Sequence, residues 1–498
     1  MNNQVYNLPP EVQQLIAEKD FRIQKLEHEL AQIKRMIFGS KSERFIPAVH
    51  PSQLSFDMNQ LQEVIVEQEV IVIDQHERKK KHREKPVRQS FPASLPREVI
   101  TIYPEGYDES TTETPIGKEV TEILEEIPGK FFVKRYERLK FAKPDNSGVV
   151  IGELPTRAID KGLFGELLLT RIIIDKYCDH LPLYRQLQRL QRAGIKLSSS
   201  TVGDVPKQVC ALLELLYTEL IRRVMACTYL QADETPHPVL DANVKEKTHR
   251  GFLWVYRSVE QGLVLFDYHK SRGKEGPRAR LKNFKGFLQT DGYSVYDEFG
   301  LRDDITLVGC MAHARRYFEK SLDSNKQEAS YFIGKLQEVY AIERIIREEV
   351  LKDEQITEIR KEKALPILNE LGVWLKENII HHPPQTPLGK AMAYSLSRWN
   401  KLTEYIHNPL VEIDNNLVEN AIRPTVLGRK NYLFSGSHEG AERSAMIYSF
   451  IGSCKINNIN PQEWLADVLV KIKDTKSSEL YTLLPNFWSE RLLTEKKS

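Results

Sequence analysis

The sequence of 498 residues has few cysteines, no long apolar run and almost no net charge, and each shortage excludes a class of protein. Its five cysteines lie far apart and form no Cys-x-x-Cys pair, which argues against a disulfide framework and a thiolate zinc site. No uncharged run is long enough to span a bilayer, and no basic-then-apolar leader follows Met1, so we expect no membrane partner and a cytoplasmic location. With 71 Lys and Arg against 69 Asp and Glu, any surface that binds nucleic acid must be local.

The chain is too long for one ordinary hydrophobic core, so we expect several domains. Its overall composition is that of an ordinary globular protein. Changes in pattern along the chain predict a leucine-zipper-like helix (1–45), a basic linker (46–97), a small β-rich module (98–150), a helical region similar to a helix-turn-helix (151–224), a mixed α/β core (225–316 and 413–450), a helical insertion in that core (317–412) and a C-terminal helical region (451–498).

The first segment repeats apolar residues every seven positions, at Ile16, Ile23, Leu30 and Ile37. A period of seven is typical of a coiled coil rather than of a single amphipathic helix. We therefore expect a homodimer or higher oligomer, with a helix packed on its own chain as the alternative. The basic run 78–88 is interpreted as a linker that also touches DNA, although such runs are usually only solvated.

Two helices separated by a glycine turn are predicted around Gly194. Ser198 or Ser199 could cap the second helix, which in a helix-turn-helix enters a major groove. DNA contacts are assigned to the basic residues of this region, Arg185, Arg189, Arg192 and Lys196. Pro206 would break a long recognition helix unless a new helix starts near Asp204, and a plain helical hairpin is an equally good interpretation.

Apolar runs in the centre of the chain follow an order typical of a ribonuclease-H-like mixed sheet flanked by helices. The run 229–232 ends at Asp233, two aromatic-rich runs flank the turn 260–262, and a later run ends at Asp291. A buried strand then leads into the basic helix of "CMAHARRYF". In such a sheet the first and fourth strands are neighbours, so both aspartates would project from neighbouring positions.

Three carboxylates of this order form a candidate metal site. Asp233 and Asp291 would end neighbouring strands, and Glu419 would project from a helix that crosses the sheet edge. That helix is expected to have Asp414 near its start and Pro424 near its end. Close carboxylates are costly unless a cation lies between them. Two divalent ions about 3.5 to 4 Å apart could activate a water or a 3′-hydroxyl and stabilise the leaving oxygen of a phosphodiester. Mg²⁺, with Mn²⁺ as a substitute, suits such oxygen ligands.

Each acid taken alone has an ordinary alternative. Asp before Gly, as at Asp291, is a common turn signal. Glu419 could simply pair with Arg423, four residues further along its helix. Glu234 would point to the opposite face of the strand from Asp233 and is therefore excluded from the metal site.

Basic residues beside these acids are expected to hold DNA phosphates. His313, Arg315 and Arg316 follow the last strand, and Arg423 lies on the helix of the third acid. The alternative is a helix start with solvated arginines and a locally satisfied histidine. Cys310, three residues before His313, is not taken as a metal ligand because two ligands do not make a zinc site.

Four motifs, in this order, closely resemble the DDE transposases of bacterial insertion sequence family sixty-six, the TnpC type: "YLQADETP", "LQTDGYSVY", "CMAHARRYF" and "IDNNLVENAIRP". The segment from "GRKNYLFSG" onward and the N-terminal helix leading into "MIFGSKSERF" are similar as well. The resemblance implies that Asp233, Asp291 and Glu419 are the catalytic triad. It further implies hydrolysis at the ends of an element, attack of the freed 3′-hydroxyl on target DNA, and possible accessory proteins from the same element.

One departure from the family pattern concerns zinc. Family members usually carry a small module with paired Cys-x-x-Cys motifs, whereas residues 95–145 contain no cysteine. We therefore predict no structural zinc.

Two alternatives to a transposase remain from the sequence. One is a ribonuclease-H-like nuclease without strand transfer, and the other is a catalytically silent DNA-binding regulator of the element. A tyrosine or serine recombinase is disfavoured, because the ordered acids indicate metal chemistry rather than a hydroxyl nucleophile.

Overall fold

The computed structural model describes residues 129, 131, 140–142, 149–151, 156–160, 162–241, 248–349 and 351–495. These residues fall into two compact units that divide at Asp160. In the smaller unit, β1 (Lys140–Ala142) pairs antiparallel with β2 (Val149–Ile151). The expected zipper-like helix, the basic linker and most of the β-rich module lie outside the described residues.

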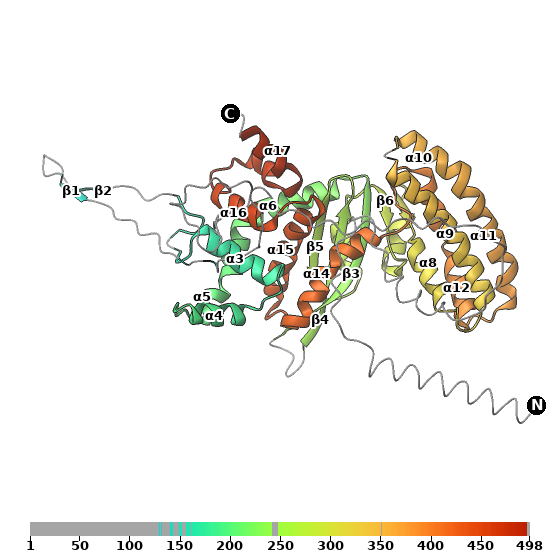
Figure 1. Ribbon diagram of the computed structural model, residues 1–498, viewed down its shortest axis with the longest axis horizontal. Coiled ribbons are helices and arrows are strands. Elements are labelled where there is room, and N and C mark those ends of the chain that lie inside the picture. Colours follow the sequence, from blue (N-terminus) through green and yellow to red (C-terminus); the bar gives the residue numbers. More distant parts are fainter. Residues whose placement is uncertain are drawn as a thin grey trace, which may run out of the picture. The chain divides into compact units, whose positions relative to one another are not determined.

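A five-stranded mixed sheet forms the centre of the larger unit (Figure 1), with the order β5-β4-β3-β6-β7. Its strands are β3 (Tyr229–Leu240), β4 (Thr248–Ser258), β5 (Leu263–His269), β6 (Gly286–Gln289) and β7 (Ile305–Val308). The strands β3, β4 and β5 pair antiparallel, whereas β6 pairs parallel with β3 and with β7. The expected hairpin is confirmed, with Gly262 at φ 61° in its turn, and the expected pairing of the first and fourth strands is confirmed by β3 and β6.

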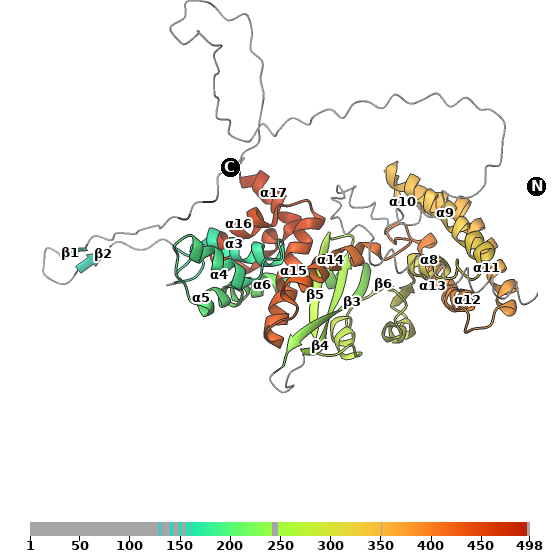
Figure 2. The same ribbon diagram turned by 60° about the horizontal axis from the view of Figure 1, so that its bottom comes forward.

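Helices cover the antiparallel part of this sheet (Figure 2) because its strands carry continuous apolar runs, which need burial on both faces. In β4 every residue from Gly251 to Tyr256 is buried. The helix α15 (His438–Ile456) lies along β5, where the Phe266 N–H donates to Ser449 Oγ at 2.8 Å and the Val264 N–H donates to Ser453 Oγ at 3.0 Å. The other helices of this part are α3 (Glu166–Tyr177), α6 (Val205–Met225), α14 (Asn416–Tyr432), α16 (Pro461–Lys471), η5 (Ser477–Leu483) and α17 (Pro485–Glu495).

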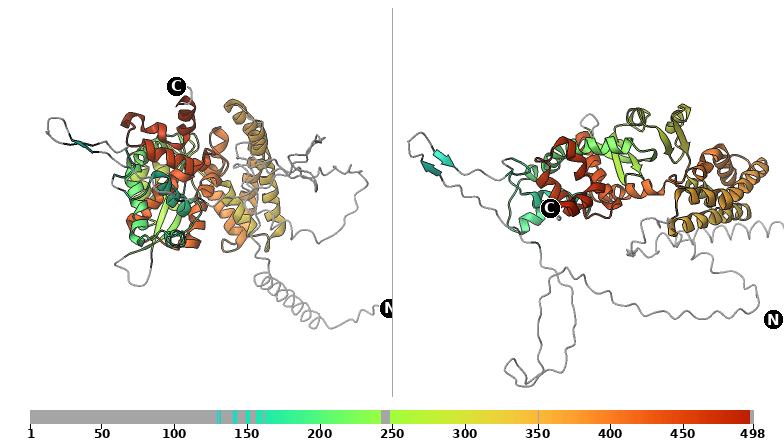
Figure 3. Two further views of the ribbon diagram at one scale, coloured as in Figure 1. Left: turned by 60° about the vertical axis from the view of Figure 1, so that its left-hand side comes forward. Right: turned by 90° about the horizontal axis from the view of Figure 1, so that it is seen from above.

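The chain between β7 and α14 is helical and forms a core of its own, and the views of Figure 3 show these helices grouped together. Phe318 stacks on Phe332, with ring centroids 3.7 Å apart, and both belong to one buried apolar cluster that reaches Val308 of β7. The elements are α8 (Met311–Glu319), α9 (Lys326–Glu348), α10 (Asp353–Ile359), the π-helix η2 (Arg360–Ala364), α11 (Leu365–Asn378), η3 (Ile379–His381), α12 (Pro387–Ser397), α13 (Trp399–Thr403) and η4 (Glu404–His407). Two short helices, α7 (Glu275–Arg280) and η1 (Ser294–Leu301), precede β6 and β7.

The region expected to resemble a helix-turn-helix contains α4 (Leu183–Arg192), α5 (Ser199–Gly203) and the start of α6. Gly194, at φ 82°, makes the turn after α4. Ser198 caps α5 by accepting a hydrogen bond from the Thr201 N–H at 3.1 Å, and a new helix starts after Asp204 with Pro206 in its first turn. The second helix is therefore only five residues long, and α6 buries one apolar face in the core.

Two expectations about where elements end were wrong. β3 does not stop at Asp233 but continues to Leu240, because β4 pairs with it along this whole length. Pro236 and Pro238, which lack N–H groups, are tolerated because the parallel pairing with β6 has already ended at Gln231. Likewise α14 runs past Pro424 to Tyr432.

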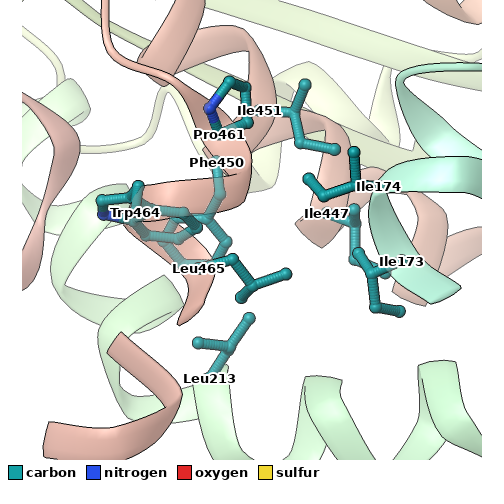
Figure 4. Close-up of a pocket in the computed structure, with 9 residues that line it drawn as sticks. All are labelled: Ile173, Ile174, Leu213, Ile447, Phe450, Ile451, Pro461, Trp464 and Leu465. Carbon is teal, nitrogen blue, oxygen red and sulfur yellow. The ribbon is translucent and has the colours of Figure 1, made fainter. Parts of the chain in front are cut away.

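The cavity in Figure 4 is a gap in apolar packing, not a ligand site. It measures about 10 Å³, the lower limit for one water molecule. Ile173 of α3, Leu213 of α6, Phe450 of α15 and Trp464 of α16 contribute to its apolar lining. Among the helices described by the structure, none is both long and apolar enough to cross a membrane.

Candidate active site

Asp233 and Asp291 lie at the same level of two neighbouring parallel chains. The last residue pair between β3 and β6 is Gln231 with Gln289, and each aspartate follows its glutamine by two residues. Asp233 thus stands where β3 loses its parallel neighbour and keeps only β4. Burial raises the pKa of Asp233 well above its usual range, and the negative charges of Glu234, Asp291 and Glu419 raise it further.

Asp291 lies in a tight turn that immediately follows β6. Its Oδ1 accepts a hydrogen bond from the Tyr293 N–H at 2.8 Å, and Gly292 adopts φ 88°, a conformation that glycine readily supplies. The Tyr394 hydroxyl, on α12, donates to the Asp291 carbonyl at 2.7 Å, and Arg398 Nη2 donates to the Gly292 carbonyl at 3.2 Å. The helical region between β7 and α14 therefore holds this turn in place.

Glu419 lies in the first turn of α14, where its carboxylate contacts the basic helix α8. Its Oε2 lies 3.6 Å from Arg316 Nη2, and its Oε1 lies 3.8 Å from His313 Nδ1. Burial raises the pKa of Glu419, and Asp291 raises it further, whereas Arg316 and Arg423 oppose the shift. The three acids expected from the sequence thus lie near enough for the charges of Asp291 and Glu419 to act on Asp233, and for that of Asp291 to act on Glu419.

Glu234 is held on the other side of the strand, as its position next to Asp233 predicts. The Arg272 guanidinium forms an ion pair with Glu234, with the Nε donating to Oε1 at 2.9 Å, and it also lies over the Tyr293 ring at 4.0 Å. This carboxylate therefore already has a cationic partner, in contrast to the paired aspartates.

The basic residues of α8 contribute unequally to the cluster. Arg316 Nη1 lies 3.2 Å from His313 Nε2, so that these two side chains and Glu419 form one contact group. Arg315 instead pairs with Glu319 on its own helix at 3.0 Å. Arg423, one turn beyond Glu419, is exposed.

The helix α4, which carries Arg185, Arg189 and Arg192, lies apart from β3 and β6 in Figure 1, and Lys196 lies in the segment after it. The helix α4 packs on α3 and α5. Arg189 forms an ion pair with the buried Asp175 of α3 and so helps to fix the two helices together. Arg185, Arg192 and Lys196 are exposed.

Sequence reasoning missed that Glu419 lies beside Cys310 and His313. Their potential ligand atoms all lie within 4.8 Å of one another. Cys310 is fully buried, its pKa lies well above the usual range because of that burial, and its Sγ accepts a hydrogen bond from the Asn415 N–H at 3.4 Å. It is therefore a protonated thiol engaged with the backbone. By contrast, His313 Nδ1 and Glu419 Oε1 make no hydrogen bond within the described part of the chain. No local sequence signal could reveal this proximity, because Glu419 lies more than a hundred residues after Cys310 and His313 in the sequence.

Comparison with known proteins relates nearly the whole chain to one family. Residues 161–443 match "Transposase IS66 family", residues 449–486 match "IS66 C-terminal element", and residues 25–100 match "Transposase C of IS166 homeodomain".

Three relatives are similar to the chain. Uncharacterized protein y4jD of Sinorhizobium fredii is 31% identical over 503 residues, which cover 97% of this chain and 97% of that protein. Uncharacterized protein y4hP of the same organism is 30% identical over 93% of this chain and 88% of its own length. Uncharacterized protein YuaK of Escherichia coli is 40% identical over 40 residues, only 8% of this chain and 43% of its own length. Because the first match covers more than half of the chain and two relatives align over nearly their full length, this chain belongs to the IS66 family of transposases.

Proposed function

We propose that this chain is a DDE-type transposase that cuts DNA at the ends of an insertion sequence and joins them to target DNA, with Asp233, Asp291 and Glu419 as its catalytic residues. The observation that carries the proposal is that Asp233 and Asp291 each follow the last residue pair of β3 and β6 by two residues, and that the charges of Asp291 and Glu419 act on Asp233. The strand order β5-β4-β3-β6-β7, antiparallel on one side and parallel on the other, supports a ribonuclease-H-like core.

The cluster fits divalent cations on the chemistry of its donors. All three donors are hard oxygen ligands, burial and the negative charges of neighbouring acids raise the pKa values of Asp233 and Glu419, and Glu419 Oε1 has no hydrogen-bond donor among the described residues. A divalent cation would relieve that repulsion, and Mg²⁺, or Mn²⁺ in its place, suits carboxylate ligands. We propose two such ions and no structural zinc. When bound, they would make a water or a 3′-hydroxyl nucleophilic and neutralise charge on the leaving oxygen.

The chain's own residues would hold the DNA strand and orient the acids. Asp291 is fixed by the Tyr293 N–H and by the Tyr394 hydroxyl. His313 and Arg316 contact Glu419, and the Arg316 guanidinium adds positive charge beside it. The exposed Arg423 lies on α14, as Glu419 does. Its guanidinium can reach a phosphate and also offsets the negative charge of Glu419.

A second DNA surface is proposed on α4 and the turn after it. Arg185, Arg192 and Lys196 are exposed there, whereas Arg189 positions α4 through Asp175. Because α5 has only five residues, these side chains would contact phosphates rather than read many bases. The zipper-like segment would pair two copies, so that two DNA ends could be held together, with accessory proteins of the element as further partners.

The test is a cleavage and joining assay with the full chain. Labelled DNA carrying the inverted ends that flank the gene is incubated with Mg²⁺ or Mn²⁺. We expect metal-dependent nicking at the ends and a joined product, both lost in Asp233→Asn, Asp291→Asn and Glu419→Gln. Asp297→Asn is the matched control, because Asp297 is an exposed acid six residues from Asp291 that pairs with Lys401.

Each other outcome would replace the proposal by a specific alternative. Nicking without a joined product would favour a nuclease. Specific binding of the ends without nicking, even after addition of the neighbouring gene products, would favour a DNA-binding regulator.

A further inference from the structure

We propose that Gln231 and Gln289 are positioning residues that hold the start of α14, which carries Glu419, beside the strands that lead into Asp233 and Asp291, and thereby set the affinity of the site for divalent cations. This inference rests on the proposed function of the carboxylates. Each glutamine precedes an aspartate by two residues, in the pattern Gln-x-Asp on β3 and again after β6. The two glutamines face each other as the last residue pair of these parallel strands, and neither is exposed to solvent.

The side chain of Gln231 binds the segment from which Glu419 projects. Its Nε2 donates to the Asp414 carbonyl at 3.0 Å. Its Oε1 accepts a hydrogen bond at 3.2 Å from the N–H of Val418, which also donates to the Asn415 carbonyl. Val418 directly precedes Glu419 in the first turn of α14, where N–H groups lack the full set of helical partners. The position of Gln231 therefore determines where the helix starts relative to Asp233.

Gln289 makes the matching connection from β6. Its Nε2 donates to the Glu412 carbonyl at 2.8 Å and to the Gly309 carbonyl at 3.0 Å. Gly309 lies just before α8, which carries His313 and Arg316. The two amides thus join four parts of the site, namely β3, β6, the start of α8 and the start of α14.

Tyr229 closes this network and fixes the orientation of both amides. Its hydroxyl donates to Gln289 Oε1 at 2.5 Å, and it accepts from Gln231 Nε2 at 2.8 Å and from the Glu412 N–H at 3.2 Å. Gln231 Nε2 also lies 2.9 Å from Gln289 Oε1. Because the Nε2 of each glutamine faces a backbone carbonyl, neither amide can be turned over without losing bonds.

A network of this kind is a costly way to build a core, since apolar side chains would fill the space without buried polar groups. The network instead fixes geometry, because buried polar groups that are all hydrogen-bonded to one another allow only one arrangement of the elements they join. Residues that orient metal ligands typically change metal affinity by 10 to 100-fold when they are replaced. We therefore expect these amides to control how well the site binds cations.

The experiment measures Mn²⁺ binding to the full chain by calorimetry, in wild type, Gln231→Met and Gln289→Met. Methionine keeps the length of the side chain and removes its hydrogen bonds. We expect Mn²⁺ to bind about tenfold or more weakly to both variants. Ser449→Ala is the matched control, because it removes a buried hydrogen bond between α15 and β5, and its Mn²⁺ affinity should equal that of wild type.

The outcomes separate this inference from the proposed function. If wild type binds no Mn²⁺, or if Asp233→Asn binds it as wild type does, the proposed function fails. If wild type binds Mn²⁺ and loses it in Asp233→Asn, while both glutamine variants bind as wild type, only the positioning role is refuted. A purely structural role would lower the thermal midpoint and leave the affinity unchanged. Should the methionine variants not fold, Tyr229→Phe, which removes one hydroxyl from the network, is expected to weaken Mn²⁺ binding, and unchanged binding would refute the inference.

Discussion

The buried ion pair between Glu343 and Arg360 offers a quantitative test of how the helical region supports the active site. Only 1% of the Glu343 side chain and 3% of the Arg360 side chain are exposed. The guanidinium donates to both carboxylate oxygens, from Nε at 2.9 Å and from Nη2 at 2.8 Å. Its Nη1 donates to the carbonyls of Tyr405 and Asn408 at 3.0 and 2.9 Å. These two residues lie just before the segment that leads into α14.

Glu343→Gln leaves the shape of the side chain and removes its charge. The Arg360 cation then stays buried with only neutral partners, so we expect a loss of about 3 to 5 kcal/mol in the stability of this region. The assay is hydrogen exchange of the amides in α9 and η2, which reports the free energy of local opening.

Two further variants make the test specific. Glu370→Gln removes the acid of a surface ion pair, in which Lys335 Nζ lies 3.1 Å from Glu370 Oε2. We expect no measurable change in the free energy of local opening. Replacing both buried partners, as Glu343→Leu with Arg360→Met, should recover stability to within about 1 kcal/mol of wild type. A loss below about 1 kcal/mol in Glu343→Gln would refute the reasoning, because the pair would then behave like an exposed one.

Three other predictions concern pH, metal-free stability and DNA. Burial lowers the pKa of His237 to about 4, against about 6.5 in an unfolded chain. Between these values the unfolded state binds a proton at this histidine and the folded state does not. The free energy of unfolding therefore falls as the pH drops from 6.5 towards 4, by about 2 kcal/mol at pH 5 relative to pH 7. Hydrogen exchange of β3 at the two pH values should show this loss in wild type and not in His237→Gln; equal losses would contradict it. Asp233 has a raised pKa, so its charge destabilises the metal-free fold at neutral pH, and Asp233→Asn should raise the thermal midpoint in EDTA; a lower midpoint would argue against mutual repulsion. Arg192→Gln and Lys196→Gln should each weaken binding to all DNA sequences alike and reduce the slope of affinity against salt by about 1, as measured by fluorescence anisotropy at several salt concentrations; an unchanged slope would remove α4 from the DNA surface.

The sequence predicts the central sheet well because its signals are local. The apolar runs around Gly262 directly predict a hairpin, and the order of the runs, typical of a ribonuclease-H-like sheet, predicts β6 beside β3. The end of β3 was mispredicted at Asp233, because Pro236 and Pro238 resemble a strand end. The prolines are tolerated because β6 no longer pairs with β3 beyond Gln231. Where that pairing ends depends on the length of β6, which the sequence around the prolines does not reveal.

The three candidate carboxylates could be predicted from the order of the strands and the helix that carry them, whereas the contacts that support these residues could not. The Gln-x-Asp pattern is visible in the sequence, but each glutamine also binds a backbone carbonyl more than a hundred residues away. The contact of His313 with Glu419 spans a similar interval. The length of α14 was underestimated because Pro424 suggests a stop, while burial of Ile422, Thr425 and Gly428 continues the helix on the sheet.

The most direct test of the central claim asks whether the carboxylate of Asp233 acts as a metal ligand. In Asp233→Cys the hard oxygen ligand is replaced by a soft sulfur, which binds Mg²⁺ poorly and accepts softer divalent ions better. End cleavage by this variant should therefore be lost with Mg²⁺ and restored at least in part with Mn²⁺, while wild type cleaves with both ions. Equal cleavage by the variant with Mg²⁺ and Mn²⁺ would contradict the account, because Asp233 would then not hold the catalytic cation.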